Sequence, residues 1–277
     1  MEIHCGKIAE MNEWFVGYLI LGAVAGFFAG LLGVGGGAIM VPVLALMFAA
    51  QGFPDQHLMH LALGTSMATI VFTSISSLRA HHQHGAVIWP IVRNIAPGIV
   101  VGTLLGAQVA GLIPTRPLAI FFACFIAYVA VQMILNVKPK PSRQLPGKAG
   151  MFGVGAFIGG ISALVAIGGG SLSVPFMTWC NVKVHHAIGT SAAIGFPIAL
   201  AGTVGYMISG YGATNLPSGS WGFIYLPALA ATVVASMLVA PLGARVAHSL
   251  PVPTVKKVFA GLLLLLLAKM LHGLFGG

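Results

Sequence analysis

The chain has 277 residues, of which 58% are hydrophobic and only 6% are charged, and its mean hydropathy is +0.99. Soluble domains carry charge on about 25% of their residues, so this composition excludes a soluble globular domain and indicates a protein whose surface is mostly covered by lipid. The formal net charge of +9 would suit a nucleic-acid partner, but the basic residues stand in short gaps between apolar runs. That placement is typical of the loop charges that orient a membrane protein, so we expect no nucleic-acid partner.

Apolar runs follow one another along the chain after a tail of residues 1–13, which lacks the basic start and cleavage pattern of a secretory signal peptide. We therefore expect the first apolar run to be retained. Crossing about 30 Å of hydrocarbon takes about 20 residues, and spanning segments should be helical because an open strand in lipid leaves backbone groups unpaired. The predicted membrane segments are 14–32, 38–50, 58–78, 87–113, 118–137, 149–167, 172–180, 186–209, 221–246 and 254–274.

A glycine triplet interrupts the first apolar stretch, where Gly35, Gly36 and Gly37 are followed by Pro42. Each glycine inside a helix costs about 1 kcal/mol relative to alanine. Residues 14–49 as one helix would be about 54 Å long, which is too long for one crossing. The pattern predicts a helical hairpin that turns at the glycines. Because proline is tolerated in the first helical turn, it also predicts short helices that start near residues 39–40 and 172–173.

The second half of the chain repeats these features. A second GGG-x4-P element at residues 168–175 matches residues 35–42 at an offset of 133, and HHAIGTS at 185–191 matches HLALGTS at 60–66 at an offset of 125. The chain is thus interpreted as a tail (1–13), a first transmembrane repeat (14–137), a basic linker (138–148) and a second transmembrane repeat (149–277). A hairpin returns the chain to its starting side, so each half makes an odd number of net crossings and the two repeats should be inverted.

The basic residues agree with inverted repeats, because most of them then fall on one side of the membrane. By the positive-inside rule the central linker is expected in the cytoplasm, with both termini on the periplasmic side. The predicted fold class is an all-α polytopic membrane protein with two inverted-topology repeats and about eight to ten transmembrane helices, including glycine-broken helical hairpins. Whether the short segments span fully or are re-entrant is left open.

Broken helices in inverted repeats are a recurring plan of secondary transporters, whose substrate binds near the membrane midplane where the breaks meet. A helix that starts inside the membrane presents unpaired N–H groups and a partial positive charge, which attract anions. The predicted substrate-binding residues are the two glycine triplets with nearby hydroxyls: Gly35, Gly36, Gly37, Thr65, Ser66, Gly168, Gly169, Gly170, Ser171, Thr190 and Ser191. Ser171 or Ser173 is a candidate N-cap of the second short helix.

Each of these assignments has a structural alternative. Glycines can merely allow close helix packing, which is the role we expect for Gly98, Gly102 and Gly106. Hydroxyls can bond the helix carbonyl four residues earlier.

The ionisable residues give few further candidates. His60 and His185 are candidates for proton or anion contacts, with interfacial helix ends as the favoured alternative. Arg93 either attracts anions or extends to the membrane surface. The histidines near Arg79 are expected to form a solvated basic loop rather than a metal site, so neither a metal nor a cofactor is expected. No acidic residue lies in any predicted span, which argues against a cation carrier.

With these motifs the sequence resembles the TauE/SafE-type sulfite exporter family over residues 14–274. The resemblance is carried by G-x2-G-x-G-G-G-x3-V-P at 30–42, GGG-x4-P at 168–175, the two GTS elements and the turn HGAVIWP at 84–90. It implies transport of sulfite, organosulfonates or related anions across the bacterial cytoplasmic membrane. The second half departs at Val165-Ala166-Ile167, which stand where the first half has Leu32-Gly33-Val34.

The function predicted from these observations is secondary transport of a small sulfur-containing anion, such as sulfite or sulfoacetate, by alternating access. Enzymatic activity is not expected, and the partners are the anion and the lipid bilayer, with proton coupling and a homodimer as further candidates. The alternatives are a passive anion channel of the same architecture and an intramembrane hydrolase that uses Ser66 or Ser191. The substrate, the direction of transport and the coupling ion stay open.

Overall fold

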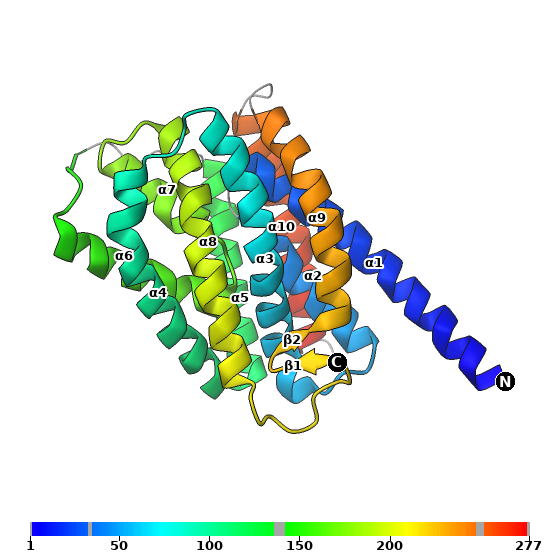
Figure 1. Ribbon diagram of the computed structural model, residues 1–277. Coiled ribbons are helices and arrows are strands. Elements are labelled where there is room, and N and C mark those ends of the chain that lie inside the picture. Colours follow the sequence, from blue (N-terminus) through cyan, green and yellow to red (C-terminus); the bar gives the residue numbers. More distant parts are fainter. Residues whose placement is uncertain (1, 33–34, 136–141, 248–251, 276–277) are drawn as a thin grey trace.

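The structure is a computed structural model that describes residues 2–32, 35–135, 142–247 and 252–275 (Figure 1). Gly33 of the first glycine motif and residues 138–141 of the predicted linker lie outside the described residues. The helices are α1 (Glu2–Leu32), α2 (Gly37–Ala50), η1 (Asp55–His57), α3 (Leu58–Gln83), α4 (Trp89–Leu112), α5 (Thr115–Leu135), α6 (Lys148–Val165), α7 (Gly170–Trp179), α8 (Val184–Ser209), α9 (Leu226–Ala247) and α10 (Val252–Phe275). One short hairpin, β1 (Ser220–Trp221) and β2 (Ile224–Tyr225), connects α8 to α9.

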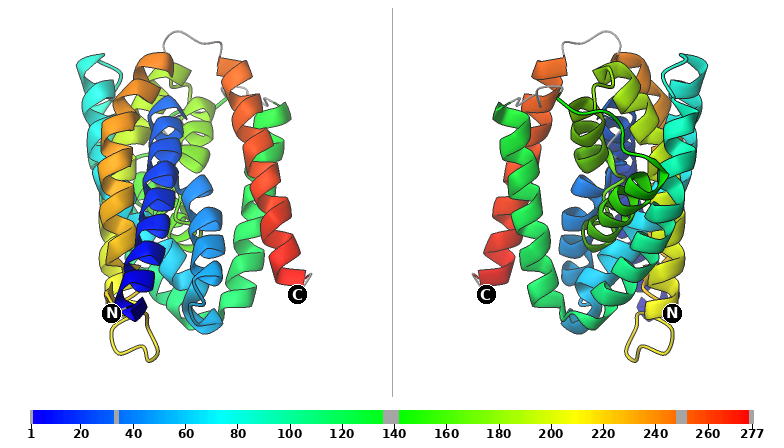
Figure 2. Two further views of the ribbon diagram at one scale, coloured as in Figure 1. Left: turned by 90° about the vertical axis from the view of Figure 1, so that its right-hand side faces the viewer. Right: turned by 90° about the vertical axis from the view of Figure 1, so that its left-hand side faces the viewer.

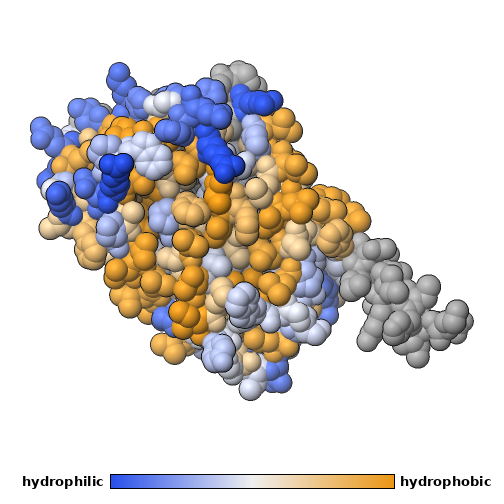
Figure 3. All heavy atoms as spheres, in the orientation of Figure 1, coloured by the Kyte–Doolittle hydropathy of each residue, from blue (hydrophilic) through white to orange (hydrophobic). Residues whose placement is uncertain are grey.

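The prediction of an all-α polytopic membrane protein is confirmed. Within the described part, seven helical segments are long and apolar enough to cross a membrane, and α2 is a shorter apolar helix. On the face shown in Figure 3, apolar residues cover most of the side of the bundle, and strongly hydrophilic residues gather mainly at one end of it. This distribution matches a protein whose sides face lipid and whose ends face water.

Helix directions alternate along the chain. The start of α1 and the end of α10 lie at one end of the bundle, which we call the terminal end (Figure 2). The end of α5 and the start of α8 lie at the opposite end, which we call the linker end. As a result, α1 runs toward the linker end and α6 runs away from it.

The most extensive helix contacts join the two halves of the chain, α1 to α9 and α4 to α6. Glycines allow these contacts, because a Cβ atom at Gly26 would lie 2.6 Å from the Cα atom of Ser236 and one at Gly102 would lie 2.0 Å from the carbonyl oxygen of Ala156. Gly98 and Gly106 also face α6, where an added Cβ atom would lie 2.0 Å and 2.7 Å from a backbone carbonyl oxygen, so the expected packing role of these glycines is confirmed.

Two mixed bundles result from this packing. Helix α3 packs on α9, α8 packs on α4, and α3 and α8 meet each other at the centre of the molecule. One bundle therefore contains α1, α2 and α3 of the first half together with α9 of the second half. The other bundle contains α6, α7 and α8 of the second half together with α4 of the first half. Helices α5 and α10 lie to one side, where they contact each other most (Figure 2).

Hydroxyl groups connect α3 to α9 inside the first bundle. The hydroxyls of Thr69 and Thr232 are 2.9 Å apart, and that of Thr73 donates to Ser236 at 2.9 Å. These buried pairs satisfy polar groups that would otherwise be costly in an apolar interior. They add polar contacts to the close backbone packing of α1 on α9.

Candidate functional site

The two glycine turns have the same backbone conformation. Gly36 is the N-cap of α2 with φ 77° and ψ −11°, and Gly169 is the N-cap of α7 with φ 78° and ψ −22°. These left-handed conformations are costly for residues with a Cβ atom, which explains glycine at both positions. The Gly36 carbonyl accepts the amide of Met40 at 3.1 Å, and the Gly169 carbonyl accepts that of Ser173 at 2.7 Å. A helix therefore begins directly after each turn.

The turns from the two halves lie against each other. A Cβ atom at Gly35 would lie 2.8 Å from the Cα atom of Gly168, and one at Gly37 would lie 1.7 Å from the carbonyl oxygen of Ala166. Only residues without side chains permit this approach. The starts of α2 and α7, with their unpaired amides and partial positive charge, are thereby brought together inside the bundle.

The predicted starts of the short helices were wrong by two or three residues. Helix α2 begins at Gly37 and α7 begins at Gly170, so Pro42 and Pro175 lie inside the helices rather than in their first turn. The N-cap prediction was also wrong, because Gly169 occupies that position and caps α7 without a side chain. Glycine in the left-handed conformation starts these helices, and the prolines mark only their second turn.

Two serines in the first turn of α7, Ser171 and Ser173, are buried, and their hydroxyl oxygens have no hydrogen-bond partner among the described residues. Each proline also lacks the amide that would bond the carbonyl four residues earlier, which is Ala38 in α2 and Ser171 in α7. Buried polar groups are normally hydrogen-bonded, so the unpaired hydroxyls of Ser171 and Ser173 beside the second turn suit a site that binds a polar ligand.

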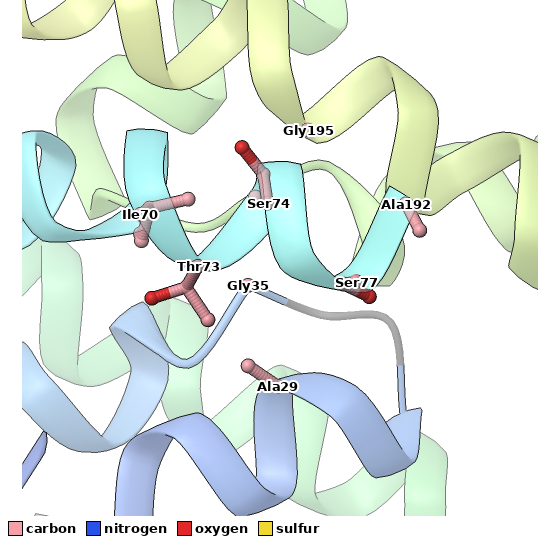
Figure 4. A pocket seen from close by; sticks show the side chains of 9 residues that line it. Ala29, Gly35, Ile70, Thr73, Ser74, Ser77, Ala192 and Gly195 are labelled. Carbon is pink, nitrogen blue, oxygen red and sulfur yellow. The ribbon is translucent and has the colours of Figure 1, made fainter. Parts of the chain in front are cut away.

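A small cavity of about 10 Å³ lies where the turns meet α3 and α8 (Figure 4). This volume is about what one water molecule needs. Its lining residues are Ala29, Gly35, Ile70, Thr73, Ser74, Ser77, Gly168, Ala192 and Gly195. Two of the predicted site residues, Gly35 and Gly168, are among them. The α8 side of the cavity is apolar, whereas α3 supplies three hydroxyls.

Those three hydroxyls were missed by the sequence analysis. Thr73 bonds to α9, and the hydroxyl of Ser74 donates to the Val71 carbonyl at 2.8 Å. The hydroxyl of Ser77 is buried and has no partner among the described residues. The available signal was the spacing of hydroxyl residues at 73, 74 and 77, which places them on one side of a helix.

The GTS elements do not line the cavity. The hydroxyl of Thr65 accepts the backbone amide of Tyr225 at 2.9 Å, and that of Thr190 accepts the amide of Ile88 at 3.0 Å. Each threonine therefore fixes the chain directly before a helix of the other half, α9 or α4. Ser66 and Ser191 are buried next to them, without partners among the described residues.

The candidate histidines lie away from the cavity. The Nε2 atom of His60 is 3.1 Å from the carbonyl oxygen of Ala110 and 3.0 Å from that of Ile113, where α4 ends. Its ring packs on Phe223, with 4.9 Å between the ring centroids. His185 is exposed in the first turn of α8. Both histidines therefore lie in the first turn of a helix, His60 in α3 and His185 in α8, which agrees with the alternative that placed them at helix ends.

Arg93 is exposed in the second turn of α4 and does not belong to the cavity lining. This position fits a guanidinium that extends to the membrane surface. In the described part, no group of three or more histidine, cysteine, aspartate or glutamate residues is arranged to hold a metal ion.

Two facing helix breaks inside a helical membrane bundle are a recurring feature of membrane transporters. The chain belongs to the sulfite exporter TauE/SafE family, whose model matches residues 18–270. A probable membrane transporter protein of Haemophilus influenzae is 38% identical over 91% of this chain and 96% of its own length. The probable membrane transporter protein YunE of Bacillus subtilis is 29% identical over 71% of this chain and 80% of its own length. No solved structure shows significant similarity to the chain.

Proposed function

We propose that this membrane transporter carries a small sulfur-containing anion, sulfite or an organosulfonate, across the cytoplasmic membrane by alternating access. The observation that carries the proposal is the contact between the two glycine turns, Gly35 against Gly168, each directly before the start of a helix. Helix N-termini bind anions through unpaired amides and the helix dipole, without a formal charge. The family description names sulfite, which fits such a site.

The charge distribution supports an anion as the substrate. The chain has four acidic residues, Glu2, Glu10, Glu13 and Asp55, and none of them follows residue 55. Among the described side chains, Asp55 is the only carboxylate, and it lies in η1 at the terminal end. Among the described side chains, therefore, no carboxylate near the helix starts offsets their positive potential.

The small volume of the cavity supports a conformational change during transport. A space of about 10 Å³ suits one water molecule and is too small for a sulfur oxyanion. Binding therefore requires α3 and α8 to separate. Hydroxyls such as those of Ser77 and Ser171, which lack partners in the described part, would then donate to the anion.

The moving units follow from the packing. We take the two repeats as inverted, which the alternating helix directions support. The close contacts of α1 with α9 and of α4 with α6 then fix two mixed bundles, and the interface of α3 with α8 lies between them. Rocking of the bundles about this interface would open the site to one side and then to the other.

The cationic residues support a cytoplasmic linker end. Arg79 and Arg245 lie near the ends of α3 and α9, and Lys183 is the N-cap of α8, and these helix ends lie at the linker end, whereas Arg116 is in the first turn of α5, which starts at the terminal end. By the positive-inside rule, the linker faces the cytoplasm and the termini face the periplasm. Proton coupling and a homodimer stay predictions.

Matched glycine variants in proteoliposomes test the proposal. Gly36 and Gly52 both have positive φ, 77° and 72°, but an added Cβ atom would lie 2.8 Å from the Ala25 carbonyl oxygen at Gly36 and would contact nothing within 4 Å at Gly52. Gly36→Ala should abolish uptake of radiolabelled sulfite or sulfoacetate, whereas Gly52→Ala should retain it.

Three outcomes would contradict the proposal. Unchanged uptake in Gly36→Ala would remove the turn from the site. Ionic currents far above the turnover of a carrier would indicate a channel. Covalent labelling of Ser66 or Ser191 by a fluorophosphonate would indicate a hydrolase, although in the described part no histidine or carboxylate is hydrogen-bonded to either hydroxyl.

A further inference from the structure

An apolar groove of about 610 Å³ separates α6 from α7. Val154 and Phe157 of α6 line one wall, and Leu172, Phe176 and Trp179 of α7 line the other. Phe157 is 67% exposed, so the groove opens toward the outside of the bundle, where lipid lies. In the described part, α7 packs mainly on α8, whereas its counterpart α2 is also covered by α10.

One end of the groove carries a fixed cation. The indole Nε1 of Trp179 donates to the Ser142 hydroxyl at 2.8 Å, and the amides of Ser142 and Arg143 approach the Trp179 carbonyl at 3.2 and 3.3 Å. The guanidinium carbon of Arg143 lies 5.5 Å from the indole ring centroid. Backbone bonds thus hold the exposed Arg143 at the groove, with tryptophan in the position it favours at a membrane surface.

The charges around this end have no acidic counterpart in the chain. Lys148 begins α6, directly after the segment that contains Arg143, and Lys183 is the N-cap of α8 shortly after Trp179. The chain has no acidic residue after Asp55, which lies at the terminal end. An apolar groove that ends at uncompensated cations complements one acyl chain and one anionic headgroup. Basic pockets between membrane helices bind such headgroups.

We propose that this groove binds an anionic phospholipid, with an acyl chain between α6 and α7 and the phosphate beside Arg143. The acyl chain of the lipid would lie against Leu172 and Pro175, which belong to the first six residues of α7. Occupancy therefore supports α7 on the side that faces α6 and steadies the glycine turn from which α7 begins.

The headgroup contact is tested with Arg143→Gln, and Arg245→Gln is the control. Arg245 is also exposed at the linker end but lies at the end of α9, outside the groove. Lipid binding to detergent-purified protein is measured by native mass spectrometry, with phosphatidylglycerol as the anionic probe and phosphatidylcholine as the zwitterionic one. The wild type should bind phosphatidylglycerol more tightly, and Arg143→Gln should weaken that binding about fivefold, as expected for one basic residue at a lipid surface. Arg245→Gln should leave it unchanged.

The groove itself is tested by filling it. An added Cβ atom meets nothing within 4 Å at either Gly153, which lines the groove, or Gly261, which faces outward from α10. Gly153→Leu should reduce the retention of both lipids without loss of folding, whereas Gly261→Leu should behave as the wild type. Equal binding of the two lipids by the wild type would overturn the proposal, and so would unchanged phosphatidylglycerol binding in either Arg143→Gln or Gly153→Leu.

Discussion

Replacing Gly195 by alanine should fill the cavity while the protein stays folded. This α8 residue lines the cavity, and an added Cβ atom would lie 3.1 Å from the Gly168 carbonyl oxygen and 3.9 Å from the Cβ atom of Ser74. The first contact is tight but requires a shift of only a few tenths of an ångström. The methyl group of Gly195→Ala would occupy the space of about 10 Å³ between the two turns.

Stability and transport should therefore change in opposite directions. Alanine is favoured over glycine inside a helix by about 1 kcal/mol, so the free energy of unfolding should rise by at most about 1 kcal/mol after the tight contact is relieved. Transport should fall at least about tenfold, which corresponds to about 1.4 kcal/mol of lost anion binding. Thermal unfolding in detergent and uptake of radiolabelled sulfite by proteoliposomes measure the two effects.

Gly160→Ala is the matched control. Gly160 also lies inside a helix, α6, and its added Cβ atom would make an ordinary contact of 3.6 Å with the Gly102 carbonyl oxygen, away from the cavity. This variant should gain similar stability and retain transport. If Gly195→Ala is folded and transports with wild-type rate and affinity, the cavity is not on the path of the anion.

Four further changes test individual side chains. Thr65→Val and Thr190→Val each remove the acceptor of a backbone amide, so each should lower the free energy of unfolding by about 1–3 kcal/mol. The KM of the folded fraction should stay unchanged, and a raised KM would place these hydroxyls in the anion site. Ser77→Ala removes a buried hydroxyl that has no partner in the described part, so stability should hold while the KM for the anion rises about tenfold. Burial raises the pKa of the Cys180 thiol, and the nearby charge of Arg143 opposes this rise. Maleimide labelling of Cys180 should therefore require a higher pH than labelling of a free thiol, and Arg143→Gln should raise the required pH further. Labelling at an ordinary thiol pH would contradict the buried position.

Much of the fold was predictable, because the spans and breaks are local properties of the sequence. Apolar length identified the long helices, and the cost of glycine inside a helix identified the two turns. The predicted segments 38–50 and 172–180 agree with α2 and α7 within two residues at either end. Their starts were misplaced because proline was taken as a marker of the first turn, whereas left-handed Gly36 and Gly169 define it.

The lining of the cavity was less predictable, because it depends on contacts between segments far apart in the chain. Thr65 and Thr190 looked like ligands, yet each accepts an amide that comes before a helix of the other half. Ser77 was missed because one hydroxyl in a long helix carries no motif. Only the packing of α3 against α8 and the glycine turns brings it to the cavity.

The most direct test of the central claim is the position of the bound anion. Selenite is a close analogue of sulfite and contains a strong anomalous scatterer, so crystals soaked with it would show the anion as an anomalous difference peak. We predict one peak between the two turns, within hydrogen-bonding distance of the amides of Gly37 and Gly170. A peak elsewhere, for example beside Arg93, together with an empty space between the turns, would contradict it.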